Sequence, residues 1–350
     1  LLEKNEDILE WNDTKKLICI YGIASAMSYL HSCNIIHRDL KPSNILINDY
    51  LFPIIVDFGL STFLHDDKDF INWDGNGTPS YIAPETMNKN IYGKPSDVYS
   101  FALTIYEIIT GIQPFATLNN EYSVLFESSK KSRPEISSKI PKCYRNLIEK
   151  CWSQEPNERP TLSEIVDLLR TDTDFITEDV DQEEYYNYIK YIDKSESGFE
   201  YHPNKQGKNQ TETEINSFEK SDIFSYLDTE LKAKKVNVDT NQTKLYDYQK
   251  QEIGRGSFGT VYKITNKKSG EIYAAKISQT YLTQCDDDTV NNLEREINII
   301  SSIEHPAILK FIGFNSINFN GKPKPTIITE LLSNGSLEDI IELERRSCGN

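Results

Sequence analysis

The chain has 350 residues and a net charge of −16, with 38% hydrophobic and 26% charged residues. Such an acidic chain would repel a phosphate backbone, so nucleic acid is excluded as its principal partner. It shows no apolar run long enough to cross a bilayer and no signal peptide, so we expect a cytoplasmic protein without membrane insertion. Its six scattered cysteines lack metal-ligand spacing, which predicts free thiols rather than disulfides or a metal site.

The first 170 residues are expected to be mostly helical. Apolar residues at helical spacing predict a buried helix at 16–32 and a second one at 97–111. Between these two segments, short apolar runs alternate with polar loops, as strands around a loop would. Further helices are expected at about 143–152 and 161–170.

The middle of the chain, residues 171–244, is polar and acidic. It carries about half of the excess negative charge, a composition typical of segments without a packed core. We therefore predict a largely flexible linker. The exception is the stretch "DQEEYYNYIKYID", which places apolar side chains on one helical face and predicts a short Tyr-rich helix at 183–193. The residues on this face are Tyr185, Tyr188, Ile189 and Ile192.

From Leu245 the chain becomes β-rich, with a single helix expected at 288–303. Its first motif, "GRGSFGTV", contains Gly254, Gly256 and Gly259. Alone this motif is weak, because a dinucleotide-binding fold uses the same glycines and opens a helix at the third. Here a β-branched, alternating segment follows as a strand, which favours a flexible β-hairpin whose backbone N–H groups cover phosphates over the dinucleotide-binding fold. A plain glycine hairpin is the alternative.

A lysine and a glutamate follow the glycine motif in an informative order. Lys276 lies on the next strand, in "YAAKIS", and Glu296 lies on the expected helix. A strand lysine can contact the α- and β-phosphates of a nucleotide if an ion pair fixes its ammonium group, and Glu296 is suited to that role. The alternative is that both are ordinary solvated surface charges.

The early stretch "HRDLKPSN" offers Asp39, Lys41 and Asn44 within six positions, and Asp57 of "DFG" follows the next apolar strand. Transfer of a γ-phosphoryl group needs a carboxylate to receive the acceptor's proton and a cation to neutralise the moving group. It also needs hard oxygen ligands for Mg²⁺, such as Asn and Asp. The alternatives, a turn aspartate and a capping asparagine, explain single residues but not the ordered set.

These motifs together resemble those of the eukaryotic protein kinase family. The segment "GTPSYIAPE" at 77–85 looks like the family's substrate-binding segment with its Ala-Pro-Glu motif. Asp97 looks like the buried helix aspartate that braces the family's catalytic loop. Arg159 looks like the residue that pairs with Glu85.

The resemblance covers about residues 1–170 and 245–346. It implies an α+β fold of two lobes, a mostly helical large lobe and a β-rich small lobe with one helix. The segment 151–169 is similar to tyrosine kinases and their tyrosine-kinase-like relatives, whereas Lys41, two residues beyond Asp39, resembles enzymes that phosphorylate Ser or Thr. Together these features indicate the tyrosine-kinase-like group, Ser/Thr type.

The resemblance also implies a role for each site residue. Asp39 would be the catalytic base and Lys41 a γ-phosphate contact, while Asn44 and Asp57 would hold Mg²⁺. Thr329 falls at the position beside the adenine pocket, where the hinge begins. The residues implied to bind ATP are Gly254, Gly256, Gly259, Val261, Ala274, Lys276, Glu296, Thr329, Glu330 and Leu331.

The order of the lobes is reversed. Residues 1–170 resemble the large lobe, 171–244 form the linker, and 245–350 resemble the small lobe, the hinge and the start of the following helix. The chain is therefore a slice of tandem kinase domains or a circular permutant. Residues 1–11 and 334–346 both resemble the first large-lobe helix, and this duplication favours the tandem slice.

Two functions compete at this point. The leading hypothesis is an ATP- and Mg²⁺-dependent Ser/Thr protein kinase with protein substrates and a signalling role. The alternative is a non-catalytic kinase-like scaffold or an inactive fragment of a tandem kinase protein. The complete set of motif residues favours the enzyme.

One loop raises a question about regulation. In kinases that this chain resembles, the arginine before the catalytic aspartate, here Arg38, usually pairs with a phosphorylated residue of the activation loop. Residues 63–77 contain no Ser, Thr or Tyr, so we expect an aspartate to supply the negative charge; the alternative is a solvated acidic loop. The candidates are Asp66, Asp67, Asp69 and Asp74.

Overall fold

The computed structural model forms two compact units. Unit 1 comprises the described residues within Leu1–Lys194, His305–Ile308 and Leu332–Asn350, and unit 2 those within Ser195–Glu304 and Leu309–Leu331. The residues described are 11–65, 68–118, 120–196, 248–256, 259–267, 269–279, 287–315, 318–320, 322 and 324–347. Both units match the expected fold class, because one is mostly helical and the other contains a sheet with one helix.

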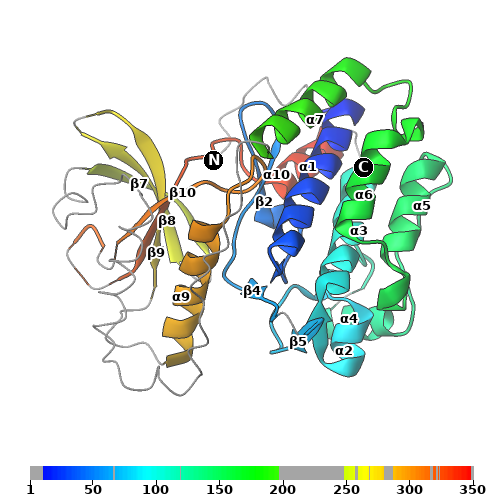
Figure 1. Cartoon of the computed structure of the whole chain (residues 1–350), viewed down its shortest axis with the longest axis horizontal. Helices are drawn as coiled ribbons and strands as arrows, with labels where there is room; N and C mark the ends of the chain where they lie inside the picture. Colours follow the sequence, from blue (N-terminus) through cyan, green and yellow to red (C-terminus); the bar gives the residue numbers. More distant parts are fainter. Residues whose placement is uncertain are drawn as a thin grey trace. The chain divides into compact units, whose positions relative to one another are not determined.

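Unit 1 contains most of the helices (Figure 1). They are α1 (Asp13–Ser32), α2 (Pro84–Lys89), α3 (Lys94–Thr110), α4 (Glu121–Ser129), α5 (Lys142–Cys151), α6 (Leu162–Thr171), α7 (Gln182–Glu196) and α10 (Leu337–Ser347). Four short 3-10 helices join them: η2 (Pro42–Asn44), η3 (Pro79–Tyr81), η4 (Pro156–Glu158) and η5 (Thr173–Phe175).

Three small antiparallel ladders shape the loops of unit 1. They pair β1 (Ile35–Ile36) with β4 (Thr62–Phe63), β2 (Ile45–Ile47) with β3 (Pro53–Ile55), and β5 (Phe70–Asn72) with β6 (Ile91–Gly93). The segment between β1 and β2 contains the candidate catalytic residues, so two ladders fix both of its ends.

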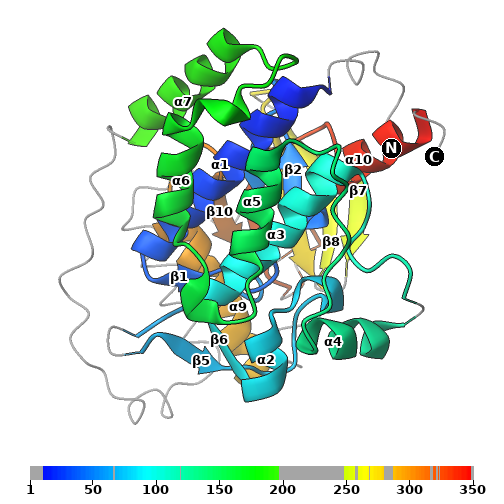
Figure 2. The same cartoon turned by 90° about the vertical axis from the view of Figure 1, so that its right-hand side faces the viewer.

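Helix α1 packs against α3 and α6 in unit 1, and α5 packs against α3 (Figure 1 and Figure 2). Most side chains of α1 are fully buried, as the apolar sequence predicts. It begins at Asp13 because the Asn12 side chain caps it by accepting a hydrogen bond from the Lys15 amide at 3.0 Å. Helix α3 ends at Gly111, whose φ of 66° lies in the left-handed region that glycine adopts without steric cost. The predictions of these two helices are confirmed.

The predicted Tyr-rich helix exists as α7 and packs into unit 1. The Tyr185 ring meets the edge of the Tyr21 ring at 5.9 Å, and its hydroxyl donates to the Leu169 carbonyl at 2.9 Å. Tyr188 and Ile192 are also buried, so the apolar face predicted from sequence is the face that packs. Residues 197–244 of the predicted linker lie outside the described residues, and their flexibility stays a prediction.

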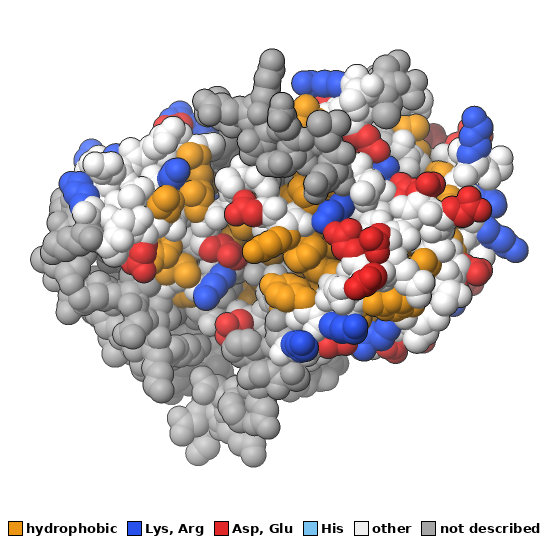
Figure 3. Space-filling model, turned by 90° about the horizontal axis from the view of Figure 1, so that it is seen from above, with side chains coloured by type: hydrophobic (Ala, Val, Ile, Leu, Met, Phe, Trp, Pro, Cys, Tyr) orange, Lys and Arg blue, Asp and Glu red, His pale blue; other side chains and the backbone are white. Residues whose placement is uncertain are grey.

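The face of unit 1 on which α7 lies also has a groove of about 600 Å³. Aromatic side chains line it together with acidic ones at the start of α7, and Figure 3 looks onto this face, where hydrophobic and acidic side chains lie side by side. The aromatic residues are Tyr50, Phe52, Tyr188 and Tyr191.

Segments from late in the chain complete unit 1. Ile340 and Ile341 of α10 are buried, and Glu344 accepts hydrogen bonds from the Trp11 indole at 3.2 Å and from Lys16 at 2.6 Å. The His305 ring stacks on Tyr29 with 5.4 Å between centroids. The helix expected near 334–346 is thus confirmed as part of the helical unit. The competing stretch at 1–10 lies outside the described residues.

Unit 2 is a five-stranded antiparallel sheet with the order β10-β11-β9-β8-β7 and one helix (Figure 1). The elements are β7 (Tyr248–Gly256), β8 (Gly259–Asn266), β9 (Ile272–Ser278), α9 (Asp287–Ser302), β10 (Phe311–Asn315) and β11 (Thr326–Thr329). One sheet face is covered by an apolar cluster that includes Ile264, Ala275 and Phe319. In the part of the chain that the structure describes, no helix has both the length and the apolar character needed to cross a membrane.

Candidate active site

The segment after β1 carries Asp39 and Lys41, and a buried carboxylate holds its backbone. Asp97, on α3 and fully buried, accepts hydrogen bonds from the amides of His37 at 2.9 Å and Arg38 at 3.0 Å. Burial alone would raise the pKa of Asp97, but hydrogen bonds and positive charge from His31 and His37 outweigh it and lower the pKa. The charged carboxylate therefore braces the loop from inside the helical core.

Asp39 lies at the centre of a hydrogen-bonded cluster. The Lys41 ammonium lies 2.9 Å from its carboxylate. The Asn44 amide nitrogen donates to the Asp39 carbonyl at 2.8 Å and to its carboxylate at 2.9 Å. The Thr78 hydroxyl donates to Asp39 at 2.6 Å and accepts from Lys41 at 2.6 Å. Three of the residues expected at the site, Asp39, Lys41 and Asn44, are thus brought together.

Thr78 is the member of this cluster that sequence reasoning did not place in the site. The sequence indicated it only as part of the segment 77–85 that resembles the substrate-binding segment. Its hydroxyl bridges the carboxylate that would receive a proton and the ammonium that would contact a phosphate. A signal for this existed in the motif "GTPSYIAPE", whose Thr precedes a turn close to the catalytic segment.

Asp57 follows β3 and has a φ of 64°. A non-glycine residue rarely adopts this left-handed conformation, and such residues cluster at functional sites. Together with Asn44 it offers the oxygen ligands that Mg²⁺ prefers. Because the Asn44 amide nitrogen is bonded to Asp39, its side-chain oxygen is the atom able to bind a cation. These two residues therefore fit the metal that the resemblance implies.

A buried ion pair anchors the segment that follows Thr78. The Arg159 guanidinium donates to both carboxylate oxygens of Glu85, each at 2.7 Å, and to the Pro95 carbonyl at 2.8 Å. Ser96 also donates to Glu85, at 2.8 Å. Neither charged side chain is more than 4% exposed. The pairing of Glu85 with Arg159 that the resemblance implies is present in the structure.

Unit 2 contains the expected glycine hairpin. Strands β7 and β8 pair antiparallel up to Gly256 opposite Gly259, so the motif joins two strands and not a strand and a helix. The two residues at the tip, 257 and 258, lie outside the described residues. At Gly259 a Cβ atom would come within 2.5 Å of the Ile277 carbonyl oxygen. Glycine is therefore required where β8 passes this close to β9.

Lys276 and Glu296 form an ion pair at 2.8 Å, from β9 to α9, and both side chains are mostly buried. The strand register sets which residues share a face with Lys276. Val261 lies directly opposite it, and Ala274 precedes it by two positions. Thr329 lies opposite Ala274, so all four side chains fall on one face, away from the apolar cluster.

The expected hinge residues follow β11. Thr329 is buried, and its hydroxyl donates to the Glu330 carbonyl at 3.1 Å. The Glu330 carboxylate accepts a hydrogen bond from the Lys310 amide at 2.8 Å. Leu331 is half-buried. The nucleotide-binding set predicted from sequence thus falls in unit 2, and the catalytic and metal-binding set falls in unit 1.

Comparison with known proteins gives a match to one family model. The model described as "Protein kinase domain" matches residues 2–168 and 248–349, which together exceed half of the chain. The match has the same two segments that the motifs indicate, and residues 169–247, including α7, lie between them.

Several curated proteins are similar to parts of the chain. "Putative serine/threonine-protein kinase/receptor R831" of Acanthamoeba polyphaga mimivirus is 38% identical over 168 residues, covering 47% of this chain and 10% of that protein. "Dual specificity protein kinase pyk3" of Dictyostelium discoideum is 38% identical over 152 residues, covering 43% and 11%. "Probable serine/threonine-protein kinase drkC" of the same organism is 36% identical over 165 residues, covering 46% and 22%. The chain thus spans less than a quarter of the length of each of these three relatives.

Proposed function

This chain belongs to the protein kinase family, and we propose that it transfers the γ-phosphoryl group of ATP to Ser and Thr hydroxyls of proteins. The observation that carries the proposal is the cluster around Asp39, in which a carboxylate, an ammonium and a hydroxyl converge within hydrogen-bond distance. The residues of this cluster suit phosphoryl transfer, which relies on positioning and electrostatic stabilisation.

The chemistry assigned to the cluster is a single displacement. The substrate hydroxyl oxygen forms a bond to the γ-phosphorus, the bond to the bridging oxygen breaks, and ADP leaves. Asp39 orients the hydroxyl and accepts its proton, and Lys41 neutralises charge on the transferred group. The Thr78 hydroxyl holds these two side chains at 2.6 Å from itself, so their spacing is set before substrate binds.

Asn44 and Asp57 would hold Mg²⁺, which supplies charge neutralisation for the phosphates when it is bound. The Asn44 side chain, at the end of η2, is fixed by its two hydrogen bonds to Asp39, so its ligand oxygen is held beside the proposed base. In unit 2, the face carrying Val261, Ala274 and Lys276 is the proposed nucleotide surface.

Specificity for Ser and Thr rests on sequence similarity. Lys41 lies two residues beyond Asp39, as in enzymes that phosphorylate Ser or Thr, and the chain resembles the tyrosine-kinase-like group. The names of the relatives support hydroxyl phosphorylation, because they include Ser/Thr and dual-specificity kinases. The proposed substrates are proteins, and the proposed role is in signalling.

The test is phosphate transfer from ATP to a generic basic protein by the chain. Wild type is expected to transfer phosphate in the presence of Mg²⁺ and to lose this activity with a chelator. Asp39→Asn should lower kcat by at least about 10²-fold, the usual size of a general-base contribution. Phosphoamino-acid analysis should give phosphoserine and phosphothreonine. If wild type transfers no more phosphate than Asp39→Asn, the non-catalytic scaffold replaces this proposal.

A further inference from the structure

Arg38, which precedes Asp39, is a buried cation that is only 4% exposed. Its guanidinium donates to the Leu60 carbonyl at 3.2 Å and forms an ion pair with Asp74. Leaving a buried guanidinium without an anion is costly, because burial penalises an unpaired charge strongly. The position next to Asp39 therefore requires a negative group from elsewhere in the chain.

Asp74 is held in place to supply that group. Its carboxylate also accepts a hydrogen bond from the Asn76 amide at 3.2 Å, and the Trp73 indole donates to the Asn76 carbonyl at 2.7 Å. The Trp73 amide donates to the Asn90 carbonyl at 3.0 Å. Burial opposes ionisation of Asp74, but the hydrogen bond and charge of Arg38 outweigh it and lower the pKa of this carboxyl. Asp74 is therefore an anion at neutral pH.

The loop is attached to the catalytic segment at two places four residues apart. Asp74 contacts Arg38, and Thr78 contacts Asp39 and Lys41. Because only four residues separate the two attachments, the position of Asp74 limits where the Thr78 hydroxyl can lie. Loss of the first attachment is expected to loosen the second.

We propose that Asp74 is a positioning residue whose permanent charge holds this loop on Arg38, so that activity does not require phosphorylation of the loop. The proposal rests on the proposed kinase function. Phosphate groups order activation loops by pairing with arginine, and residues 63–77 contain no Ser, Thr or Tyr that could carry one. Of the other candidate aspartates, Asp66 and Asp67 lie outside the described residues, and Asp69 is exposed.

The first test uses the full chain after phosphatase treatment, with mass spectrometry to verify that no phosphate remains. Wild type is expected to keep its activity. Asp74→Asn should lower kcat about tenfold with an unchanged KM for ATP, the loss expected when a charge-assisted hydrogen bond becomes neutral. Asp69→Asn, a carboxylate of the same loop, is the matched control and should be unchanged. Loss of wild-type activity on dephosphorylation, or an unchanged kcat in Asp74→Asn, overturns the proposal.

A second variant tests whether a phosphate at position 74 can replace the aspartate. Asp74→Thr replaces the permanent charge with a hydroxyl that an added kinase can phosphorylate. This variant should be as weak as Asp74→Asn until a phosphate is present at position 74, and should then regain activity. Recovery shows that Arg38 requires an anion and not an aspartate in particular. Full activity of the unphosphorylated variant contradicts the proposal.

Hydrogen exchange separates this proposal from the proposed function. Amides of residues 70–78 should exchange faster in Asp74→Asn than in Asp69→Asn, whether or not the chain transfers phosphate. If wild type transfers no phosphate but this difference appears, the kinase function fails and the loop attachment stands. Equal exchange in the two variants means that the ion pair does not hold the loop.

An independent observation concerns a pocket of about 420 Å³ on unit 2. Eleven residues line it, and they include four cations and no carboxylate, although the whole chain has a net charge of −16. The four cations are Lys250, Arg255, Lys322 and Lys324. Thr260, Tyr262 and Ile277 line the same pocket, which places it on the sheet face opposite Lys276.

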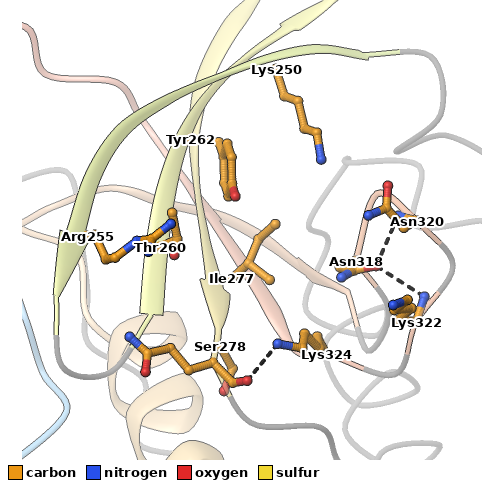
Figure 4. Close-up of a pocket in the computed structure, with 11 residues that line it drawn as sticks. Lys250, Arg255, Thr260, Tyr262, Ile277, Ser278, Asn318, Asn320, Lys322 and Lys324 are labelled. Carbon is orange, nitrogen blue, oxygen red and sulfur yellow. Dashed lines mark hydrogen bonds between the residues drawn. The ribbon is translucent and has the colours of Figure 1, made fainter.

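Three of these cations have neighbours that orient them, and one neighbour is a carboxylate outside the lining: Arg255 forms an ion pair with Glu252 at 3.3 Å, while 68% of the Arg255 side chain is exposed. In Figure 4 the side chains of Lys250 and Tyr262 point from the strands toward the loop that carries Asn318 and Lys322. The Lys250 ammonium lies 5.3 Å from the Tyr262 ring centroid. Lys324 donates to the Gln279 carbonyl at 2.6 Å. The Asn318 side chain accepts from the Lys322 amide at 3.1 Å and so shapes the loop.

The geometry points to a binding site for a phosphorylated side chain of a peptide, on the side of the sheet away from the proposed nucleotide surface. Lysine ammonium groups bind phosphate as point charges, and the flanking asparagine amides can donate to its oxygens. A volume of about 420 Å³ admits one phosphorylated side chain with its neighbours, not a folded domain.

The test is fluorescence titration of the full chain with three labelled probes: a short peptide with one phosphoserine between two glutamates, the same peptide with Ser unmodified, and the same peptide with Ala in place of all three. We expect the phosphopeptide to bind, to weaken as salt rises, and to lose at least about tenfold in affinity with Lys322→Glu, which turns attraction into repulsion. Lys267→Glu, an exposed lysine outside the pocket, is the control. Equal affinity of both variants overturns the assignment, as does binding of the unmodified or the Ala peptide as tight as that of the phosphopeptide.

Discussion

Unit 1 and unit 2 hold their candidate functional residues in place in different ways. In unit 1 the catalytic segment depends on charged groups that are almost completely buried, such as Asp97 and the Glu85–Arg159 pair, each with several partners. In unit 2 the proposed nucleotide face carries the Lys276–Glu296 ion pair, whose side chains are 27% and 13% exposed. Removing one partner of a fully buried pair is costly, and this cost falls as solvent reaches the pair. Breaking the pair in unit 2 is therefore expected to cost less stability than breaking the Glu85–Arg159 pair in unit 1.

The largest effect is expected where the buried pair is broken. Arg159→Ala leaves Glu85 buried without its counter-ion and should lower the free energy of unfolding by about 3–5 kcal/mol. Arg346→Ala is the matched control, because Arg346 pairs with Glu342 on the same helix while 69% and 49% of the two side chains are exposed, and it should cost about 1 kcal/mol or less. Denaturant unfolding measures both. Equal losses would remove the distinction between buried and solvated pairs.

A slightly smaller effect is expected from α10, which comes from the end of the chain but packs in unit 1. Ile340→Ala should cost about 2–5 kcal/mol, because it leaves a cavity where a side chain is only 2% exposed. Glu342→Ala, on the exposed side of the same helix, should be nearly neutral. Hydrogen exchange should place the Ile340→Ala loss in α1 and β2.

The same experiment bears on the reversed order of the lobes. Residues 1–10 compete with α10 in sequence, as a duplicated helix would in a slice of tandem domains. If Ile340→Ala leaves the stability of unit 1 unchanged, α10 does not occupy this position in solution. A clear loss shows that one chain completes its own helical unit from both ends.

The ion pair of unit 2 should show the opposite balance, a small loss of stability with a clear loss of nucleotide binding. Glu296→Gln should lower the free energy of unfolding by about 1–2 kcal/mol, less than Arg159→Ala, because solvent reaches this pair only in part. ATP affinity should fall about tenfold, because the Lys276 ammonium is no longer held for the phosphates. Thermal unfolding and ATP titration test the two parts separately. A stability loss as large as that of Arg159→Ala would contradict the comparison.

The sequence predicted the long helices because their apolar periodicity is strong, and it missed the short ones. Helix α2 has six residues, and α4 buries only Val124 and Ser128, so neither gives a clear pattern. At α7 the polar composition of the whole segment predicted a linker, but the apolar face within it predicted both the helix and the side chains through which it packs. Local periodicity thus predicted a helix that composition over a long window does not show.

For the candidate site, the motifs identified the residue types, but long-range geometry decided their partners. Four aspartates of one loop were equivalent by composition, and only the path of the backbone brings Asp74 to Arg38, 36 residues earlier. The Thr78 bridge to Asp39 spans 39 residues and depends on the same loop path. The presence of α10 in unit 1 likewise depends on packing between segments about 300 residues apart, as in the Trp11–Glu344 hydrogen bond.

The smallest effect is expected at Glu107, a buried carboxylate of unit 1. At Asp97 hydrogen bonds and positive charge outweigh the effect of burial on the pKa, whereas at Glu107 they do not. Burial raises the pKa of Glu107, as does nearby Glu338 on α10, while the Tyr81 hydroxyl and Arg345 oppose the shift. A carboxyl whose pKa is raised in the folded state contributes stability below its unfolded pKa and loses it as pH rises through the folded pKa. Wild type should therefore lose stability relative to Glu107→Gln as pH rises from about 4.3, the usual value for Glu, toward neutrality. Thermal unfolding across this range measures the difference, with the exposed Glu149→Gln as control. A difference that stays constant with pH would mean that Glu107 titrates alike in the folded and unfolded chains.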